Sequence, residues 1–558
     1  MFLLVAPQWA GAQDNSGQVT VTGSVKDSAG ARLPGVTVLV AGVTGKGTTT
    51  NADGRFVLDA KPNATLQFTL MGFETVTIPL AGRTSIDVVL REKVSQLSDV
   101  VITAYGKKQQ REAIVGAVTT VNPKDLKIPS SNLTTALAGQ VAGMIAYQRS
   151  GQPGQDNASF FVRGVTTFGY KQDPLILIDN VELTATDLAR LQVDDIASFS
   201  ILKDASATSL YGARGANGVI LVTTKEGRAG KAKINFRFEN SISQATKNIE
   251  MADPVTYMNL FNEAIMTRDS LGAPRYDQNK INHTINGDNK FVYPAVDWMN
   301  ELFKKRTNNQ RANLSVSGGG EVARYYVAGS FNRDNGILKV SPVNNFNNNV
   351  KLDNYQLRSN VNINLTKTTE MVVRLAGNFD EYTGPVTQDA SYGTDLYSQV
   401  MHTSPVDFPA YYTPDSSTLF EKHILFGNKP LETGLLGTNP YAQLLRGYKN
   451  FSRSRMSAQV ELTQNLSFIT KGLNFRGMVT TNRYSFFDVV RQYNPFYYQV
   501  GDYDRKTDQF RLVWLNNKPG EATEYLDFTP GNRVISTFVY LQGILDYNRT
   551  FGDHTISS

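Results

Sequence analysis

The side chains that most often do chemistry in proteins are sparse in this chain. It has no cysteine and only four histidines among 558 residues. Without cysteine there is no disulfide, thiolate metal site or cysteine nucleophile. The histidines stand far apart, with no H-E-x-x-H motif and no partner at helical spacing, so we expect surface side chains rather than metal ligands. They are His283, His402, His423 and His554. The sequence therefore predicts no catalytic site, metal or cofactor.

Charge adds few candidate sites. The formal net charge of +6 is modest over this length, and no block of Lys and Arg suggests nucleic acid. Residues 344–354 are rich in Asn and Asp, whose oxygens suit Ca²⁺. A solvated loop is the interpretation that we favour for them.

One short segment has the features of a docking strand. Residues 99–104, Asp-Val-Val-Ile-Thr-Ala, are mostly apolar and β-branched, and polar residues flank them. An isolated strand has unpaired N–H and C=O groups, so it either joins a sheet of its own chain or waits for another chain. Within this chain it would be the last strand of the preceding region or the first of the following one.

The regions before and after this segment have different sequence patterns and predict different folds. Residues 19–92 alternate apolar and polar positions in short runs separated by Ala-Gly and Asp-Gly turns, which predicts a small β-sandwich. Residues 111–227 mix an apolar strand at 175–178, a short helix near 205–210 and a return strand at 219–224. The most helical stretch is 126–141, with Ser130-Ser-Asn132 as an N-cap. This mixture predicts an α/β globule.

Beyond Gly227 long alternating segments dominate. Runs of about ten residues, long enough to cross a bilayer when tilted, recur near 234–239, 355–365, 371–379, 456–462 and 539–547. Short turns are expected at 318–321, 366–370, 465–471 and 550–553, and much longer connections lie between the resulting hairpins. This alternation is typical of outer-membrane barrels. We count about eight strands and the start of a ninth at His554.

The first residues favour export. Ala10-Gly11-Ala12 is an A-x-A cleavage site after a short apolar run, but the first basic residue is Lys26. We interpret residues 1–12 as the remnant of a signal peptide clipped at its start. The alternative is a frayed apolar N-terminus.

Several motifs resemble one family. The segments GSVKDSAGARLPGVTVLVAG, TNADGRFVL and LMGF resemble the carboxypeptidase-regulatory-like domain. LSDVVITAYGKK, LAGQVAGMIAYQRSGQPG, FVRGV, DPLILID and above all SILKDASATSLYGARGANGVILVTTKEG resemble SusC/RagA-type TonB-dependent transporters. Two departures are Asn180, where the family usually has Gly, and Gly215, where Ala is common. Asn tolerates positive φ better than most residues, so the first change is mild.

The resemblance implies a mostly β architecture. It comprises a β-sandwich at 19–92, a linker with the TonB box at 93–110, a plug at 111–227 and a partial transmembrane antiparallel barrel at 232–558. Family members close about 22 strands, wide enough to need a plug. We therefore expect the chain to be an N-terminal part, fragment or disrupted product of a transporter roughly twice as long.

The resemblance also assigns roles. Asp99, Val100, Val101, Ile102, Thr103 and Ala104 would be the TonB box, which adds a strand to TonB by β-augmentation. Arg163 and Arg214 would pair with barrel acids and lock the plug, although plain surface arginines are the alternative. Gly164, Gly212, Gly215 and Gly218 fit tight turns and close backbone packing.

The implied function is energy-coupled import across the outer membrane of a Gram-negative bacterium. The partners would be TonB with its energising inner-membrane complex, a SusD-type surface lipoprotein acting as a lid, outer-membrane lipid, and a glycan or other oligomeric nutrient. Aromatic residues in the long loops would stack on sugar rings, or else form an interfacial girdle or the core of the loops. They are Tyr411, Tyr412, Tyr493, Phe496, Tyr497 and Tyr498.

Two other functions compete with import. A non-transporting surface receptor or adhesin would need no TonB box, so residues 99–104 argue against it. A periplasmic enzyme with a carboxypeptidase-like accessory domain would need zinc ligands that the sequence lacks.

Overall fold

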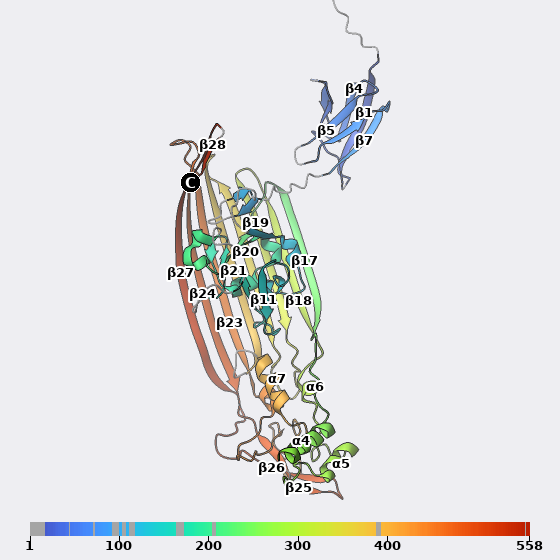
Figure 1. Ribbon diagram of the computed structural model, residues 1–558, viewed down its shortest axis with the longest axis vertical. Coiled ribbons are helices and arrows are strands. Elements are labelled where there is room, and N and C mark those ends of the chain that lie inside the picture. Colours follow the sequence, from blue (N-terminus) through green and yellow to red (C-terminus); the bar gives the residue numbers. More distant parts are fainter. Residues whose placement is uncertain are drawn as a thin grey trace, which may run out of the picture. The chain divides into compact units, whose positions relative to one another are not determined.

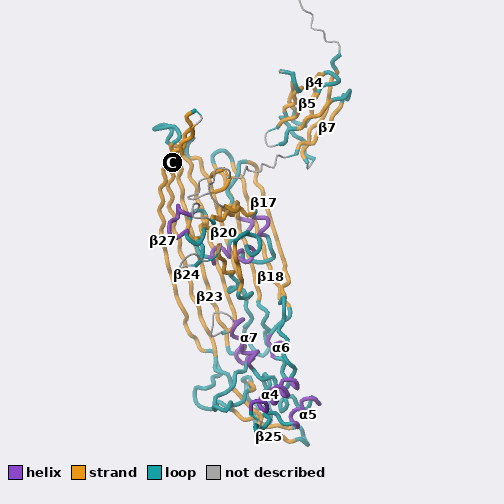
Figure 2. Tube along the Cα trace, in the orientation of Figure 1, coloured by secondary structure: helices purple, strands orange, loops and turns teal. Residues whose placement is uncertain are grey.

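The computed structural model describes residues 17–28, 30–43, 45–70, 73–91, 100–102, 108–110, 118–162, 164, 172–203, 208–269, 271–386, 392–552 and 554–557. The chain divides into two compact units. One comprises Met1–Val101 with Gln109–Ala113, and the other comprises Ile102–Lys108 with Ile114–Ser558. Figures 1 and 2 draw the elements of both units, which we describe one at a time.

The first unit is a β-sandwich. Its strands are β1 (Val19–Asp27), β2 (Thr37–Val40), β3 (Gly47–Thr49), β4 (Arg55–Ala60), β5 (Thr65–Thr69), β6 (Val76–Pro79) and β7 (Ser85–Leu90). They form two sheets with the orders β4-β1-β7 and β3-β2-β5-β6. Alternation decides which side chains meet between the sheets: in β4, Phe56, Leu58 and Ala60 are buried while the residues between them are exposed. The predicted sandwich is therefore confirmed.

The apolar segment after the sandwich pairs locally. β8 (Val100–Ile102) and β9 (Lys108–Gln110) form a two-stranded sheet of their own. Among the described strands, β8 extends neither sheet of the sandwich nor the sheet that follows. A pair of three-residue strands is marginal on its own, because so few backbone groups are satisfied.

Residues 118–224 form an α/β globule, which we call the plug. Its elements are β10 (Val118–Val121), η3 (Pro123–Leu126), α1 (Leu133–Ala136), β11 (Met144–Gln148), β12 (Ala158–Val162), β13 (Leu175–Ile178), β14 (Val181–Glu182), α2 (Ala185–Arg190), η4 (Val193–Asp195), β15 (Ile196–Leu202), η5 (Ser209–Gly215) and β16 (Val219–Thr224). The main sheet has the order β10-β15-β16-β13-β14, and β11 pairs with β12. Leu126, Leu188, Phe199 and Ile220 are among its fully buried core residues.

The plug's helices differ from the prediction. The single helix expected over 126–141 is one turn, α1, which Asn132 caps, after the separate 3₁₀ turn η3. Gly139 and Gly143 both have φ of +75°, which ends any helix there. The helix expected near 205–210 lies largely outside the described residues; Thr208 is helical, and the 3₁₀ segment η5 follows it. The helix α2 was not predicted. Six residues are too few to show a helical period, so the Thr184–Asp187 capping box was the available signal.

The longest strands form one antiparallel sheet, which we call the wall. Its strands are β17 (Gly230–Gln244), β18 (Arg306–Gly319), β19 (Ala323–Asn335), β20 (Lys351–Asn364), β21 (Thr369–Pro385), β23 (Gly447–Asn465), β24 (Leu473–Gln492), β27 (Asp527–Phe551) and β28 (His554–Ser557). Each pairs with the next in this order. Short turns lie at one end of the wall and long connections at the other (Figure 1). The predicted alternation of short and long connections is confirmed.

The two faces of the wall have opposite character. On β24, Phe475, Val479 and Phe487 are exposed, whereas Thr480 and Asn482 are almost fully buried on the other face. The plug lies against this second, inward face (Figure 1). Apolar side chains on the outer face and polar ones inside are the pattern of an outer-membrane barrel strand.

The long connections carry their own elements, which we call the loop assembly. These are α4 (Pro254–Arg268), α5 (Gln278–Asn286), α6 (Trp298–Leu302), α7 (Tyr392–His402), β22 (Phe426–Gly427), α8 (Pro440–Leu445), β25 (Tyr497–Asp504) and β26 (Gln509–Trp514). They gather beyond one end of the wall (Figure 2). No helix in the described ranges, not even the 15-residue α4, is long and apolar enough to cross a membrane.

Candidate functional site

On the inward face of the wall, the strand register aligns side chains of neighbouring strands in rows. Residues that pair across neighbouring strands lie side by side, so Asn360, Arg374, Gln459 and Thr480 form one row from β20 to β24. Polar side chains of this kind cannot bury themselves against an apolar surface without losing hydrogen bonds. The plug must therefore offer polar partners.

Carboxylates of the plug meet arginines of the wall. Glu226 Oε1 lies 2.6 Å from Arg374 Nη2, and Asp187 Oδ1 lies 2.6 Å from Arg455 Nε. Three longer or peripheral pairs complete the set: Asp194–Arg237 at 2.9 Å, Asp179–Arg358 at 3.6 Å and Asp195–Arg358 at 3.7 Å. In these pairs the negative charge belongs to the plug, or to the segment just after β16, and the positive charge to the wall.

One deeply buried pair runs the other way. Arg190, at the end of α2, lies 3.5 Å from Asp380 of β21, and these side chains are only 3% and 1% exposed. Asp380 also accepts from Arg453 and, at 2.5 Å, from the Asn354 amide. The Gln356 amide donates to the backbone carbonyl of Arg190. A carboxylate this buried is tolerated because several donors surround it.

Asp195 is a buried carboxyl of the plug, and its burial disfavours the ionised form. The Tyr326 hydroxyl donates to it at 2.8 Å. Burial raises the pKa of Asp195, and the nearby Arg358 guanidinium and the Tyr326 hydrogen bond only partly oppose that effect. The wall thus holds this carboxylate by a donor and a cation together.

Neutral hydrogen bonds extend the contact. The Asn360 amide donates to Thr224 Oγ1 at 2.8 Å and to the Lys225 carbonyl at 2.7 Å, and the Gln459 amide donates to the Asp179 carbonyl at 3.1 Å. Ser131 donates its hydroxyl proton to Asp334 of β19. Main-chain carbonyls near the ends of plug strands therefore find their partners on the wall.

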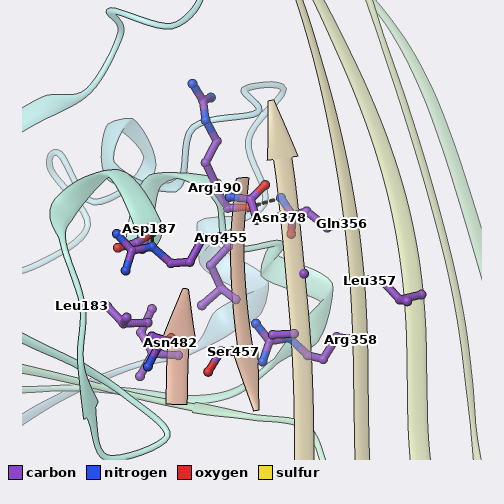
Figure 3. Close-up of a pocket in the computed structure, with 14 residues that line it drawn as sticks. Leu183, Asp187, Arg190, Gln356, Leu357, Arg358, Asn378, Arg455, Ser457 and Asn482 are labelled. Atoms are coloured by element: carbon purple, nitrogen blue, oxygen red, sulfur yellow. Dashed lines mark hydrogen bonds and ion pairs between the residues drawn. The ribbon is translucent and has the colours of Figure 1, made fainter. Parts of the chain in front are cut away.

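A small cavity lies inside this contact. It has a volume of about 70 Å³, room for a few water molecules, and Arg190, Arg358 and Arg455 line it with Asn378 and Asn482. Figure 3 shows these side chains coming from both the plug and the wall. The Asn482 side chain is 1% exposed, and its amide has no hydrogen-bond partner in the described part of the chain. Such a lining suits water rather than an apolar side chain.

The predicted locking arginines lie elsewhere. Arg163 is outside the described residues. Arg214 pairs with Glu182 of the plug itself at 2.9 Å, and both side chains are largely exposed, so in the described ranges it meets no acid of the wall. Among the plug arginines that the structure describes, Arg190 meets a wall acid, and sequence reasoning missed it. No motif marks Arg190, because its partner lies on a strand far along the chain.

The glycines occupy constrained positions. Gly164, Gly212 and Gly218 have φ of +96°, +58° and +93°, which side chains rarely adopt. A Cβ atom on Gly215 would lie 2.9 Å from the Thr208 carbonyl oxygen, so this backbone packs closely. Asn180 has φ of +67°, which explains how it stands in for a glycine.

The loop aromatics are mostly packed against one another. Tyr412, Phe496 and Tyr498 are buried in one cluster of the loop assembly. Tyr493 and Tyr497 pack against a second cluster. Tyr411 is 40% exposed, with its ring stacked 5.6 Å from that of Tyr441. Their burial favours loop core among the alternatives that the sequence left open.

Two expectations about polar loop residues are wrong. His423 is not a surface histidine: its ring stacks 3.7 Å from that of Phe496, Nε2 lies 2.8 Å from the Tyr498 hydroxyl, and burial lowers its pKa. Asn348 and Asn349 are buried, and both donate to backbone carbonyls, so this stretch is not simply a solvated loop. Across the described ranges, no group of three or more His, Asp or Glu could hold a metal ion.

The candidate TonB box is described only in its middle. Val100, Val101 and Ile102 form β8, and Asp99, Thr103 and Ala104 lie outside the described residues. A strand paired with three residues of β9 leaves its outer edge available for another chain.

Two regions of the chain match known protein families. The TonB-dependent Receptor Plug Domain matches residues 110–219, and the CarboxypepD_reg-like domain matches residues 21–102. TonB-dependent receptor P39 of Formosa agariphila is 27% identical over 97% of this chain and 45% of its own length. TonB-dependent receptor SusC of Bacteroides thetaiotaomicron is 29% identical over 63% of this chain and 34% of its own length. The chain belongs to the SusC/RagA-type TonB-dependent receptors.

Solved structures of this family share the fold. The RagAB peptide importer in its open-open state superposes with a TM-score of 0.58 at 19% identity, over 81% of this chain and 55% of that one. This chain therefore spans less than half of the curated receptors named above and about half of the RagAB chain.

Proposed function

We propose that this chain provides the plug and part of the barrel of an outer-membrane importer for a large nutrient, energised through TonB. The observation that carries the proposal is the plug seated on the polar inward face of the wall through pairs such as Glu226–Arg374 and Arg190–Asp380. A globule held in a lumen by polar contacts can be displaced when water replaces those contacts. Residues Asn360 and Gln459 would release the plug's carbonyls to water in the same way.

In the proposed mechanism, the TonB box is the segment that TonB binds and pulls. Residues 99–104 would leave the short β8–β9 pair and add a strand to the periplasmic domain of TonB. Main-chain hydrogen bonds supply this grip, so the energy of the inner-membrane complex reaches the plug through the backbone that follows. The proton-motive force would then loosen the plug and open a path along the wall.

Location and partners follow from the same arrangement. The exposed outer face of the wall, with Phe475, Val479 and Phe487, would face outer-membrane lipid. The loop assembly, with its own buried clusters, would stand on the cell surface and support a SusD-type lipoprotein lid. An oligosaccharide is the substrate class we favour. The peptide named for RagAB is the other class to test.

A backbone substitution in the TonB box tests this function. Val101→Pro removes one N–H from the strand, whereas Val101→Ala keeps it. We expect Val101→Pro to lose binding to the purified periplasmic domain of TonB and to abolish uptake of labelled maltoheptaose, laminarihexaose or levanhexaose, while Val101→Ala keeps most of both. Import by the Val101→Pro protein at the wild-type rate would contradict the assignment. Surface binding without uptake by the wild-type protein would favour an adhesin.

A further inference from the structure

A short segment of the loop assembly lies between two fixed points. We call this segment, residues 419–424, the strap. Before the strap, the Asp415 carboxylate accepts from the Leu512 N–H of β26 at 2.6 Å. After it, the Phe426 N–H of β22 donates to the Phe496 carbonyl at 3.1 Å. Within the described residues, no backbone hydrogen bond joins the strap itself to β25 or β26, so its side chains must hold it there.

His423 connects the strap to β25 through its ring. The ring stacks on that of Phe496, with centroids 3.7 Å apart and planes 15° from parallel. Its Nε2 lies 2.8 Å from the hydroxyl oxygen of Tyr498. Phe496 and Tyr498 are only 6% and 3% exposed, so the histidine ring covers part of a buried cluster. The uncharged ring therefore holds the strap as an apolar side chain with one hydrogen bond.

The second ring nitrogen of His423 is buried without a hydrogen-bond partner. Among the described residues Nδ1 has none, although Glu421 Oε2 lies 3.5 Å away. Protonation places an N–H on both ring nitrogens, and this second donor would need an acceptor. A buried donor that is both charged and unsatisfied is costly. The pocket therefore suits the neutral ring and disfavours the charged one.

The charged groups around the ring point to solvent as the place for a protonated histidine. Burial lowers the pKa of His423 below its ordinary value of 6.5, and the exposed carboxylates of Glu421 and Glu524 only partly oppose that effect. Tyr498 offers no charge, because burial raises its pKa to about 12. Asp415 keeps its charge, since the donors around it outweigh its burial and hold its pKa at about 2. A proton on His423 would therefore find its partners outside the buried cluster.

We propose that His423 is an acid-released latch: on taking up a proton, its ring leaves the buried cluster and turns toward Glu421, and the strap comes away from β25. The strap carries the exposed apolar side chains of Leu419 and Phe420. The loop assembly thus presents one surface at neutral pH and another in acid, with the two anchors in place in both. The latch lies within the loop assembly and does not rest on the proposed import function.

The direction of the pH effect follows from the burial of the ring. The latched ring binds a proton less readily than the released ring, so acid favours release. The hold of the latch is fully present above the ordinary histidine pKa of 6.5 and is lost as the pH falls below it. The ratio of released to latched strap should rise by up to about tenfold per pH unit, until the latched ring is itself protonated.

A distance between the strap and β26 tests the latch in the full chain in detergent. Phe420→Cys with Val513→Cys gives two exposed labelling sites, and the chain has no native cysteine to interfere. Double electron–electron resonance between spin labels should show one narrow distance at about pH 7.5 and a broader, longer distribution at about pH 5. Hydrogen exchange should rise in the strap over the same range, while Leu512 and Phe426 stay protected.

Three variants of the labelled chain separate the parts of the latch. His423→Phe keeps a ring on Phe496 and takes up no proton, so its narrow distance should persist at both pH values. Glu421→Gln removes the carboxylate that favours the charged ring and should lower the pH of half-release. His402→Gln is the matched control, because His402 is exposed and its Nδ1 lies 2.7 Å from the Ser398 carbonyl of its own helix. It should respond to pH as the parent chain does.

Several outcomes would overturn the latch. They are a parent distance that does not change with pH, a His423→Phe chain that responds as the parent does, a response lost in His402→Gln, or half-release at a higher pH in Glu421→Gln. The measurement uses no substrate and no TonB. Failure of the latch would therefore leave the proposed importer standing, and failure of the importer would leave the latch standing.

Discussion

The plug and the loop assembly contact the same strands of the wall through different kinds of interaction, polar for the plug and apolar for the loop assembly. The plug meets β21 through Arg374 and Asp380, both charged, and through water-sized gaps lined by arginine and asparagine. The loop assembly packs Trp298, Phe408 and Phe426 into a dry cluster of rings and aliphatic side chains. Separating the apolar side chains would expose their surface to water and cost free energy. A polar contact can instead be exchanged for hydrogen bonds to water at small net cost.

The change of character occurs within one strand. Along β21 the inward side chains run from Arg374 through Asp380, both facing the plug, to Tyr382, which packs against the loop cluster. One strand can therefore present a releasable surface to one neighbour and a permanent one to the other. This division is what the proposed importer would require, because its plug would move while the loops keep their shape.

The largest effect should come from the loop core. Phe426 is fully buried, and Phe426→Ala should destabilise the loop assembly by about 3–5 kcal/mol through the cavity it leaves. Hydrogen exchange by mass spectrometry should show faster exchange in α8 and β25, and unchanged exchange in the plug's β15 and β16. Equal loosening of plug and loops would break the comparison.

Removing the central wall acid should act on the plug instead. Asp380→Asn leaves the buried guanidiniums of Arg190 and Arg453 without their carboxylate, which we expect to cost about 3 kcal/mol. Exchange should rise in α2, while β25 and β26 stay protected. The double variant Arg190→Met with Asp380→Leu should recover the part of the loss that comes from Arg190, since it removes that buried guanidinium together with the carboxylate and leaves only Arg453 without its acid. A double variant no better than Asp380→Asn would mean that the pair itself stabilises the plug.

Acid should affect the loop assembly more gently. Burial opposes ionisation of Asp415, but hydrogen bonds from the Leu512 N–H and from Ser417 and Thr418 outweigh it and hold the pKa of Asp415 at about 2. Because the folded pKa lies below the ordinary value of 3.8 for an aspartate, this stability is present above about pH 4 and is lost as the pH falls toward 2. Up to about 2 kcal/mol is involved. Urea unfolding of the loops at pH 5 and pH 3 should show the loss, and Asp415→Asn should flatten it. An identical pH dependence in the variant would assign the effect to other carboxylates.

The strands of the wall could be predicted from the sequence, whereas the residues that join the plug to the wall could not. Alternation around Phe475 and Val479 is local, so the strands, their turns and the long connections could be read directly. Arg190 and Asp380 are brought together by a register that depends on everything between them, and no local pattern records it. Buried loop rings such as Phe496 could not be told from exposed ones without tertiary packing.

The most direct test of a plug that must move past its wall is to fasten it there. Ser131 of the plug bonds Asp334 of the wall, and the chain has no native cysteine to interfere. Ser131→Cys with Asp334→Cys is designed to form a disulfide on oxidation, because these two side chains contact each other directly. Under the proposed import function, we expect the oxidised protein to bind an oligosaccharide probe normally but not to import it, and import to return on reduction, with both single variants active throughout. Import at the wild-type rate with the disulfide fully formed would contradict the account.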